Sequence, residues 1–202
     1  MPEVDFDLYL ITDLAVCGTE DALLAAVAAA LRAGGDRVAV QLRDKNLQPE
    51  RRERIGVALR DLTRAQGASL WVHAGADPDL PRRLGADGVH LPGRAAVLPG
   101  LPFARSCHDE ADLRAAAAEG ASFATLSPVL ASPGKGAPIG WRKFEQWVER
   151  SPLPVVALGG MLGEHAPEAR KHGAAAVAAI RGVLGQEDPG AAVRRFLRGP
   201  GS

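Results

Sequence analysis

Residues 154–160 read Pro154-Val155-Val156-Ala157-Leu158-Gly159-Gly160, a short apolar run that ends in two glycines. No polar residue interrupts the run, so the pattern predicts a strand that is buried on both faces rather than on one. Strands of this kind belong to parallel sheets whose two faces are covered by helices. The run therefore predicts an α/β protein.

Similar apolar runs recur along the whole chain, and segments with helical periodicity separate them. The other runs are Phe6–Thr12, Val38–Leu42, Leu70–Val72, Val89–Leu91, Phe103–Cys107, Phe123–Leu126 and Ala176–Ile180. About eight strand–helix units predict a single (β/α)8 TIM barrel of short form over residues 1–202, with a loose tail at residues 199–202. The alternative is an open doubly wound sheet, which usually has five or six strands.

The amino-acid composition limits the kinds of partner that the protein is expected to bind. Lys and Arg number 24, Asp and Glu also number 24, and the formal net charge is zero, so no general attraction to nucleic acid or to an anionic membrane is expected. The longest apolar run, residues 22–31, is well short of the roughly 20 residues of a membrane helix. Two cysteines, Cys17 and Cys107, form no disulfide framework or metal motif. We expect a cytoplasmic protein, and the sequence leaves open whether it is a homodimer.

Active sites of TIM barrels lie at the carboxyl ends of the strands, so the residues that follow each apolar run are the candidates. This set is basic, carries imidazoles and is poor in carboxylates, which favours a small phosphorylated or carboxylated ligand. The candidates are Gln41, Arg43, Lys45, His73, His90, His108, Ser132, Lys135, Gly159, Gly160, Ile180 and Arg181.

Two groups of candidates suggest anion binding. Gln41, Arg43 and Lys45 alternate along one strand end, so their donors point the same way and suit an oxyanion; the alternative is a salt bridge from Arg43. The pair Gly159-Gly160 and the pair Ile180-Arg181 follow the last two strands, where barrels commonly bind phosphate. Glycine allows a close approach of ligand oxygens, although any tight turn favours glycine as well.

The histidines and one long loop suggest further roles. His108 directly follows the fifth run, and its side chain type suits acid–base catalysis near neutral pH. The alternative is a helix-capping residue. His73 and His90 either contact substrate or pack at the rim, and His165 and His172 are expected to be solvated. The loop of residues 127–138, which carries Ser132 and Lys135, is long enough to be a binding loop or a mobile surface loop.

The chain resembles the thiamine phosphate synthase/TenI family over nearly its whole length. The most specific pieces are Gln41-Leu42-Arg43-Asp44-Lys45, residues 85–91 (Gly-Ala-Asp-Gly-Val-His-Leu), residues 128–135 and residues 155–161. The resemblance implies a TIM barrel in which Gln41, Arg43 and Lys45 face a pyrimidine diphosphate. It also implies that Ser132, Lys135, Gly160 and the backbone at Ile180 and Arg181 hold ligand phosphates.

Two departures from the family pattern concern Mg²⁺, which the synthases of this family use. Where the synthases carry aspartate ligands, this sequence has Ala74 and Ala95, and Mg²⁺ requires oxygen ligands. No metal site and no cofactor are therefore expected, unless a synthase uses a rearranged Mg²⁺ site with Asp13 or Asp87.

These departures resemble the TenI branch, whose members include metal-independent thiazole tautomerases. The resemblance implies that His108 is the acid/base of an isomerase that aromatises thiazole carboxylate phosphate. The first alternative is a Mg²⁺-dependent thiamine phosphate synthase, which joins hydroxymethylpyrimidine diphosphate to thiazole phosphate. The second is a barrel that binds a phosphate ester without turnover and regulates a partner.

Overall fold

Eight parallel strands form a closed barrel in the computed structural model, which describes residues 4–44, 46–74, 77–93 and 95–198. The strands are β1 (Leu8–Ile11), β2 (Val38–Leu42), β3 (Leu70–His73), β4 (Gly88–Leu91), β5 (Phe103–Cys107), β6 (Phe123–Leu126), β7 (Val155–Ala157) and β8 (Ala176–Ala179). Each strand pairs with its neighbour in the sequence, and β1 also pairs with β8. The predicted TIM barrel is confirmed, and the open-sheet alternative is wrong.

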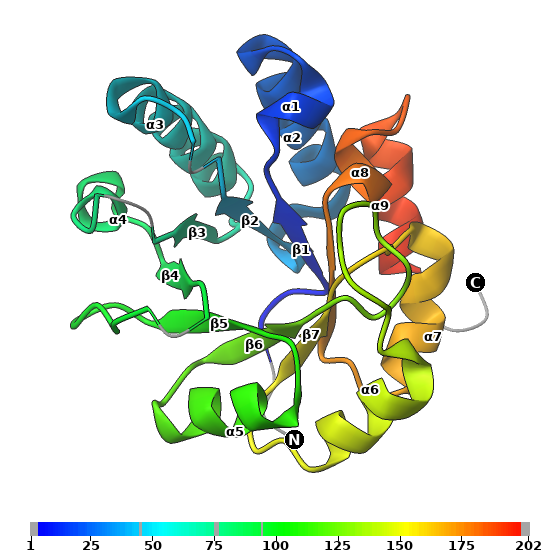
Figure 1. Ribbon diagram of the computed structural model, residues 1–202. Coiled ribbons are helices and arrows are strands. Elements are labelled where there is room, and N and C mark those ends of the chain that lie inside the picture. Colours follow the sequence, from blue (N-terminus) through cyan, green and yellow to red (C-terminus); the bar gives the residue numbers. More distant parts are fainter. Residues whose placement is uncertain (1–3, 45, 75–76, 94, 199–202) are drawn as a thin grey trace.

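Helices surround this barrel on the outside (Figure 1). They are α1 (Leu14–Cys17), α2 (Glu20–Gly34), α3 (Pro49–Ala65), α4 (Leu80–Leu84), α5 (Glu110–Ala118), α6 (Gly140–Glu149), α7 (Ala166–Lys171), α8 (Arg181–Leu184) and α9 (Pro189–Leu197). Two 3₁₀ turns, Gly35–Arg37 and Gly163–His165, complete the pattern. None of the described helices has the length and apolar character that crossing a bilayer demands. The tail at residues 199–202 lies outside the described residues.

The segment between β4 and β5 differs from the expected strand–helix repeat. Within its described residues it contains no helix, because Pro92, Gly93, Pro99, Gly100 and Pro102 oppose helix formation. The buried guanidinium of Arg105 holds part of this segment instead: Nη1 donates to the carbonyl oxygens of Gly93 and Ala95 at 3.1 and 2.6 Å. Its Nε donates to Glu119 Oε2 at 2.7 Å.

Strand residues alternate between two apolar layers, which explains why most strand positions are apolar. One layer packs between the strands and the helices and includes Leu8, Leu10, Val38 and Val40. The other fills the barrel interior; it includes the aromatic rings of Phe6, Tyr9, Trp71 and Phe123, whose neighbouring centroids lie 4.8–6.5 Å apart. The rings fill the barrel from its amino-terminal end, so side chains beyond them form the floor of the mouth.

One glycine makes this packing possible. Gly88 begins β4 directly beside Trp71, and a Cβ atom at this position would lie only 2.3 Å from the indole ring. The Gly-Ala-Asp-Gly sequence before β4 therefore has a steric role in the interior.

Asp87 of the same sequence accepts a hydrogen bond from the backbone N–H of Leu70 at 2.7 Å, at the amino-terminal ends of β3 and β4. The suggestion that Asp87 helps to bind Mg²⁺ at the mouth is therefore wrong.

Candidate functional site

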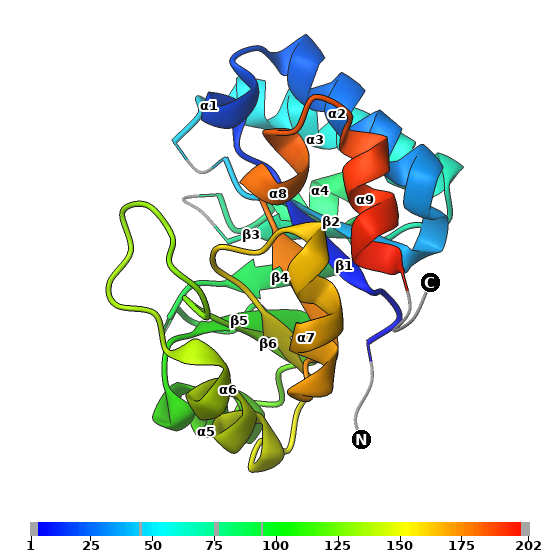
Figure 2. The ribbon, with the colours of Figure 1, turned by 90° about the vertical axis from the view of Figure 1, so that its right-hand side faces the viewer.

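A cavity of about 300 Å³ opens at the carboxyl ends of β1, β2, β7 and β8, against the loop between β6 and α6. Figure 2 shows this loop projecting from the barrel. Seven predicted site residues line the cavity together: Arg43, Ser132, Lys135, Gly159, Gly160, Ile180 and Arg181. Residues that lie up to 138 positions apart in the sequence thus share one wall because each follows the carboxyl end of a strand.

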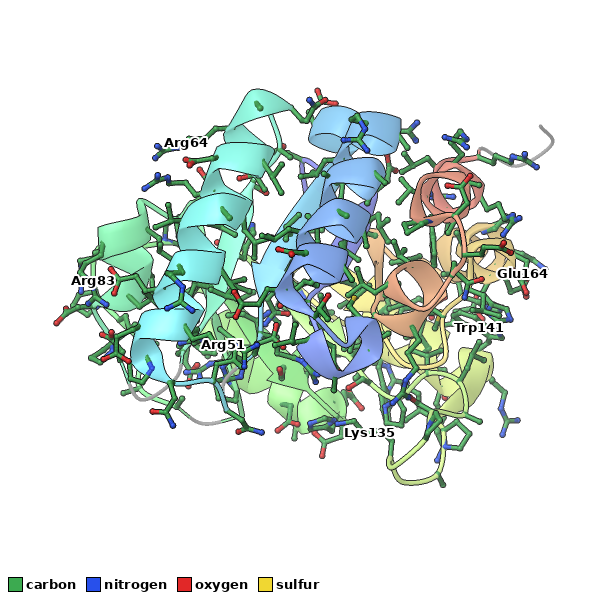
Figure 3. All side chains as sticks on the ribbon, turned by 90° about the horizontal axis from the view of Figure 1, so that it is seen from above. Arg51, Arg64, Arg83, Lys135, Trp141 and Glu164 are labelled. Atoms are coloured by element: carbon green, nitrogen blue, oxygen red, sulfur yellow. The ribbon has the colours of Figure 1, made fainter. Side chains whose placement is uncertain are left out.

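The cavity is cationic although the whole chain is neutral. Arg43, Lys135 and Arg181 line it, and Asp13 is the carboxylate among the described lining residues. Arg43 Nη2 lies 2.6 Å from Asp13 Oδ2, so the predicted salt bridge and the predicted ligand contact concern the same guanidinium. Figure 3 shows Lys135 at the end of the barrel opposite Arg64, which belongs to the last turn of α3. The excess of positive charge favours an anionic ligand.

Gly159 and Gly160 adopt left-handed backbone conformations, with φ of 104° and 66°. A Cβ atom at Gly159 would lie 2.7 Å from Pro128 Cα, and one at Gly160 would lie 2.5 Å from the Ala131 carbonyl oxygen. The two glycines therefore let the loop after β6 pack closely against the end of β7. This packing is a sufficient reason for glycine at both positions. The predicted contact of the two glycines with phosphate stays a prediction.

Gln41, His73 and His90 lie deeper than the cavity and do not line it. Their side chains are buried in the barrel, with 2–9% of each residue exposed. Burial, together with the neighbouring His73, lowers the pKa of His90 to about 3. His90 is therefore neutral near pH 7. The residues form the floor beneath the mouth, and their predicted role in substrate binding stays a prediction.

His108 follows β5 and is exposed at the rim, outside the set of described residues that line the cavity. Its Nδ1 lies 2.7 Å from the carbonyl oxygen of Ser127. A carbonyl oxygen only accepts hydrogen bonds, so Nδ1 carries a proton and donates it. In the neutral imidazole this leaves the lone pair on Nε2, which is the atom able to take a proton from a ligand.

Three residues that sequence reasoning missed fix the strand ends. Asp44 accepts hydrogen bonds from Thr12 Oγ1 at 2.5 Å and from the N–H of Leu14 at 2.6 Å. Thr12 Oγ1 in turn accepts from the N–H of Arg43 at 2.9 Å. Arg52 is buried on α3 and donates from Nη2 to the His73 carbonyl oxygen at 2.6 Å. One feature of the sequence could have indicated the role of Asp44. It lies between Arg43 and Lys45, and the alternation of side chains along an extended segment directs it away from the side on which those two lie.

The described residues at the mouth do not fit a bound Mg²⁺. Ala74 and Ala95 offer no side-chain oxygen, and the described residues contain no group of three or more His, Cys, Asp or Glu side chains placed to hold a metal. The nearby carboxylates of Asp13 and Asp44 already bind Arg43, Thr12 and the backbone of Leu14. Lys45, a predicted ligand of the diphosphate, lies outside the described residues.

A larger hollow, of about 740 Å³, lies at the opposite end, where α6 and α7 meet the amino-terminal ends of β1, β7 and β8. His172 lines it, with Nδ1 3.2 Å from Glu145 Oε2 and Nε2 2.9 Å from Glu168 Oε1. Its ring also stacks on Trp141 at 5.5 Å. The expectation that His172 is solvated is wrong, because these contacts connect the two helices. His165 is also engaged, since its Nδ1 accepts from the N–H of Leu162 at 3.1 Å.

The closed parallel barrel places this chain in the class of (β/α)8-barrel proteins, and its cationic cavity lies at the carboxyl ends of the strands, where sites of this class are found. The family model described as thiamine monophosphate synthase matches residues 8–183. This chain belongs to that family, so the resemblance inferred from its motifs is confirmed.

Named relatives agree with this assignment. The chain is 39% identical to the putative thiamine-phosphate synthase of Geobacter sulfurreducens, and the match covers 98% of this chain and 95% of the relative. It is 35% identical to the thiamine-phosphate synthase of Roseiflexus castenholzii, over 93% and 85% of the two chains. Among solved structures, the thiamine phosphate pyrophosphorylase from Pyrococcus furiosus superposes with a TM-score of 0.82 at 28% identity, over 95% and 94% of the two chains.

Proposed function

We propose that this chain is an enzyme of thiamine biosynthesis and that its cavity binds the phosphate of a phosphorylated thiazole. The observation that carries the proposal is the gathering of Arg43, Lys135 and Arg181 around one cavity beside Gly159 and Gly160. Cationic donors suit a phosphate ester, and the backbone N–H groups of glycines can approach its oxygens closely. The family assignment supports the thiamine pathway as the source of the ligand.

The first candidate reaction joins hydroxymethylpyrimidine diphosphate to thiazole phosphate, as in a thiamine phosphate synthase. The names of the relatives, which are thiamine-phosphate synthases, support this reaction above the other candidate. In it, the thiazole nitrogen bonds to the pyrimidine methylene carbon while the bond from that carbon to the diphosphate breaks. Arg43 and Lys135 would then stabilise the charge on the departing diphosphate. The described residues at the mouth do not fit Mg²⁺, so this role falls to the cationic side chains.

The second candidate reaction is the tautomerisation of thiazole carboxylate phosphate, which a specific observation favours. His108 has its Nδ1 held by the Ser127 carbonyl oxygen at 2.7 Å, which leaves Nε2 as a base at the rim. Nε2 would remove a ring proton, the double bond would shift into the ring, and a proton would return to the exocyclic carbon. This isomerisation needs neither a metal nor a leaving group, in agreement with the alanines at positions 74 and 95.

One pair of assays distinguishes the candidates. The purified chain is incubated with hydroxymethylpyrimidine diphosphate and thiazole phosphate, with and without Mg²⁺, and pyrophosphate release is followed by ³¹P NMR. In parallel, the thiazole carboxylate tautomer is incubated in D₂O, and isomerisation and deuterium uptake are followed by ¹H NMR. Turnover in one assay assigns the reaction. Tight binding of thiazole phosphate without turnover would favour the regulatory alternative, and no binding would contradict the proposal as a whole.

A further inference from the structure

A line of hydrogen bonds connects the packed interior of the barrel to its mouth through three side chains. The hydroxyl of Tyr9 lies 3.2 Å from Nδ1 of His90, and Nε2 of His90 lies 2.8 Å from Oγ of Ser106. The rings of Tyr9 and His90 stack with their centroids 5.8 Å apart. Tyr9 is fully buried, His90 is 3% exposed and Ser106 is half-buried. The line therefore runs from a dry core toward the carboxyl end of β5, where Ser106 lies outside the set of described residues that line the 300 Å³ cavity.

Because His90 is neutral, the hydrogen bonds along this line can be ordered in two ways. His90 is held neutral by burial, which lowers its pKa to about 3, so the imidazole has one N–H and one lone pair. Either Tyr9 donates to Nδ1 and Nε2 donates to Ser106, or Ser106 donates to Nε2 and Nδ1 donates to Tyr9. The two arrangements present opposite ends of the Ser106 hydroxyl to the mouth.

The Tyr9 hydroxyl decides between the arrangements. Within the described residues, Nδ1 of His90 is its one hydrogen-bond partner. If Nδ1 donated to Tyr9, the phenolic proton would be buried without an acceptor, and a buried donor without a partner is costly. The arrangement in which Tyr9 donates leaves no such group. In that arrangement the proton of His90 lies on Nε2 and is donated to Ser106 Oγ, so the proton of Ser106 points away from His90.

We propose that Tyr9 is a positioning residue that holds His90 in its Nε2–H tautomer and thereby makes Ser106 a hydrogen-bond donor toward the mouth. The ligand group that faces Ser106 is then an acceptor, such as an anionic oxygen or an unprotonated ring nitrogen. Only this statement about the ligand rests on the proposed function. The order of the hydrogen bonds is a property of the ligand-free protein.

Long-range ¹H–¹⁵N NMR spectra of histidine-labelled protein test the order directly, because protonated and unprotonated imidazole nitrogens have well-separated shifts. The wild type is expected to show His90 protonated at Nε2 by on the order of tenfold over Nδ1. Tyr9→Phe removes the donor and is expected to shift the ratio toward a mixture. Ser106→Ala, which keeps Tyr9, is the matched control and is expected to keep the wild-type tautomer. A wild type protonated at Nδ1, or evenly mixed, would overturn the proposal.

A double-mutant cycle tests whether Tyr9 acts through Ser106. Tyr9→Phe is expected to lower kcat/KM of the active reaction by about 2- to 10-fold in the wild-type background, and to have no further effect in the Ser106→Ala background. Additive losses would mean that Tyr9 is only structural and would overturn the positioning role. If neither thiamine-pathway reaction is found, the proposed function fails, while the tautomer measurement still decides the order of the hydrogen bonds.

Discussion

Nδ1 of His108 donates to the carbonyl oxygen of Ser127 at 2.7 Å, so a backbone group of the neighbouring strand end sets the protonation of a histidine at the rim. Because the partner is a carbonyl oxygen, no substitution at position 127 removes it. The loop after β6 therefore has two roles at once, since it also carries Ser132 and Lys135 into the cavity. A change in this loop would alter both the base and the phosphate contacts.

His108→Gln separates these two roles. If the chain is a tautomerase, the substitution is expected to lower kcat by roughly 10²- to 10⁴-fold, the usual contribution of a positioned acid/base. The Kd for thiazole phosphate, measured by calorimetry, is expected to stay within about twofold, because His108 does not line the cavity. Unchanged isomerisation in the variant would remove His108 from the proposed role.

Lys135→Gln and Arg181→Gln test the anion site. Each removes a cation from the cavity and is expected to weaken binding of thiazole phosphate about tenfold at low salt, with a smaller effect at high salt. Lys143→Gln is the matched control, because Lys143 is exposed on α6 and does not line the cavity. Calorimetric titrations at two ionic strengths measure both effects. Equal Kd values for Lys135→Gln and Lys143→Gln would contradict a role for the loop lysine.

The sequence predicts which residues line this cavity better than it predicts how deep each candidate side chain lies in the barrel. Arg43, Lys135 and Arg181 follow different strands, and the rule that barrel sites lie at the carboxyl ends is enough to bring them together. The contact between Arg43 and Asp13 follows from the same logic, since β1 and β2 are neighbours in the sheet.

The depth of a side chain in the barrel is harder to predict, because it depends on the register of the strands. His73 pairs with His90, and His90 pairs with Ala104, two residues before Ser106. This stagger places the two imidazoles below the rim, although His73 directly follows one apolar run and His90 lies within the next. Alternation along a strand indicates which side chains point inward, but it does not give their height along the barrel axis.

Gly160→Ala tests the close approach of the loop to β7. The substitution places a Cβ atom 2.5 Å from the Ala131 carbonyl oxygen at a left-handed backbone position. It is expected to lower the free energy of unfolding by about 1–3 kcal/mol and to weaken phosphate binding. Gly136→Ala on the same loop is the control, since no atom lies within 4 Å of its added Cβ. Urea unfolding of both variants measures the difference, and equal stabilities would show that the loop simply moves aside.

The neutral His90 predicts a pH dependence of stability with a definite sign. Its pKa in the folded chain is about 3, against about 6.5 in an unfolded one. Below pH 6.5 the unfolded chain therefore binds a proton that the folded chain does not bind. The folded state loses stability as the pH falls from about 6.5 toward 3, by up to about 1.4 kcal/mol per pH unit.

His90→Gln removes this proton uptake and isolates it from the titration of carboxylates. The difference in unfolding free energy between the wild type and the variant is expected to be constant above pH 7. Between pH 7 and pH 5 it is expected to change by about 1–2 kcal/mol at the expense of the wild type. Urea unfolding at half-unit steps of pH measures this difference. A difference that does not vary with pH would mean that His90 binds its proton equally well in both states, which is incompatible with a buried, neutral imidazole between Tyr9 and Ser106.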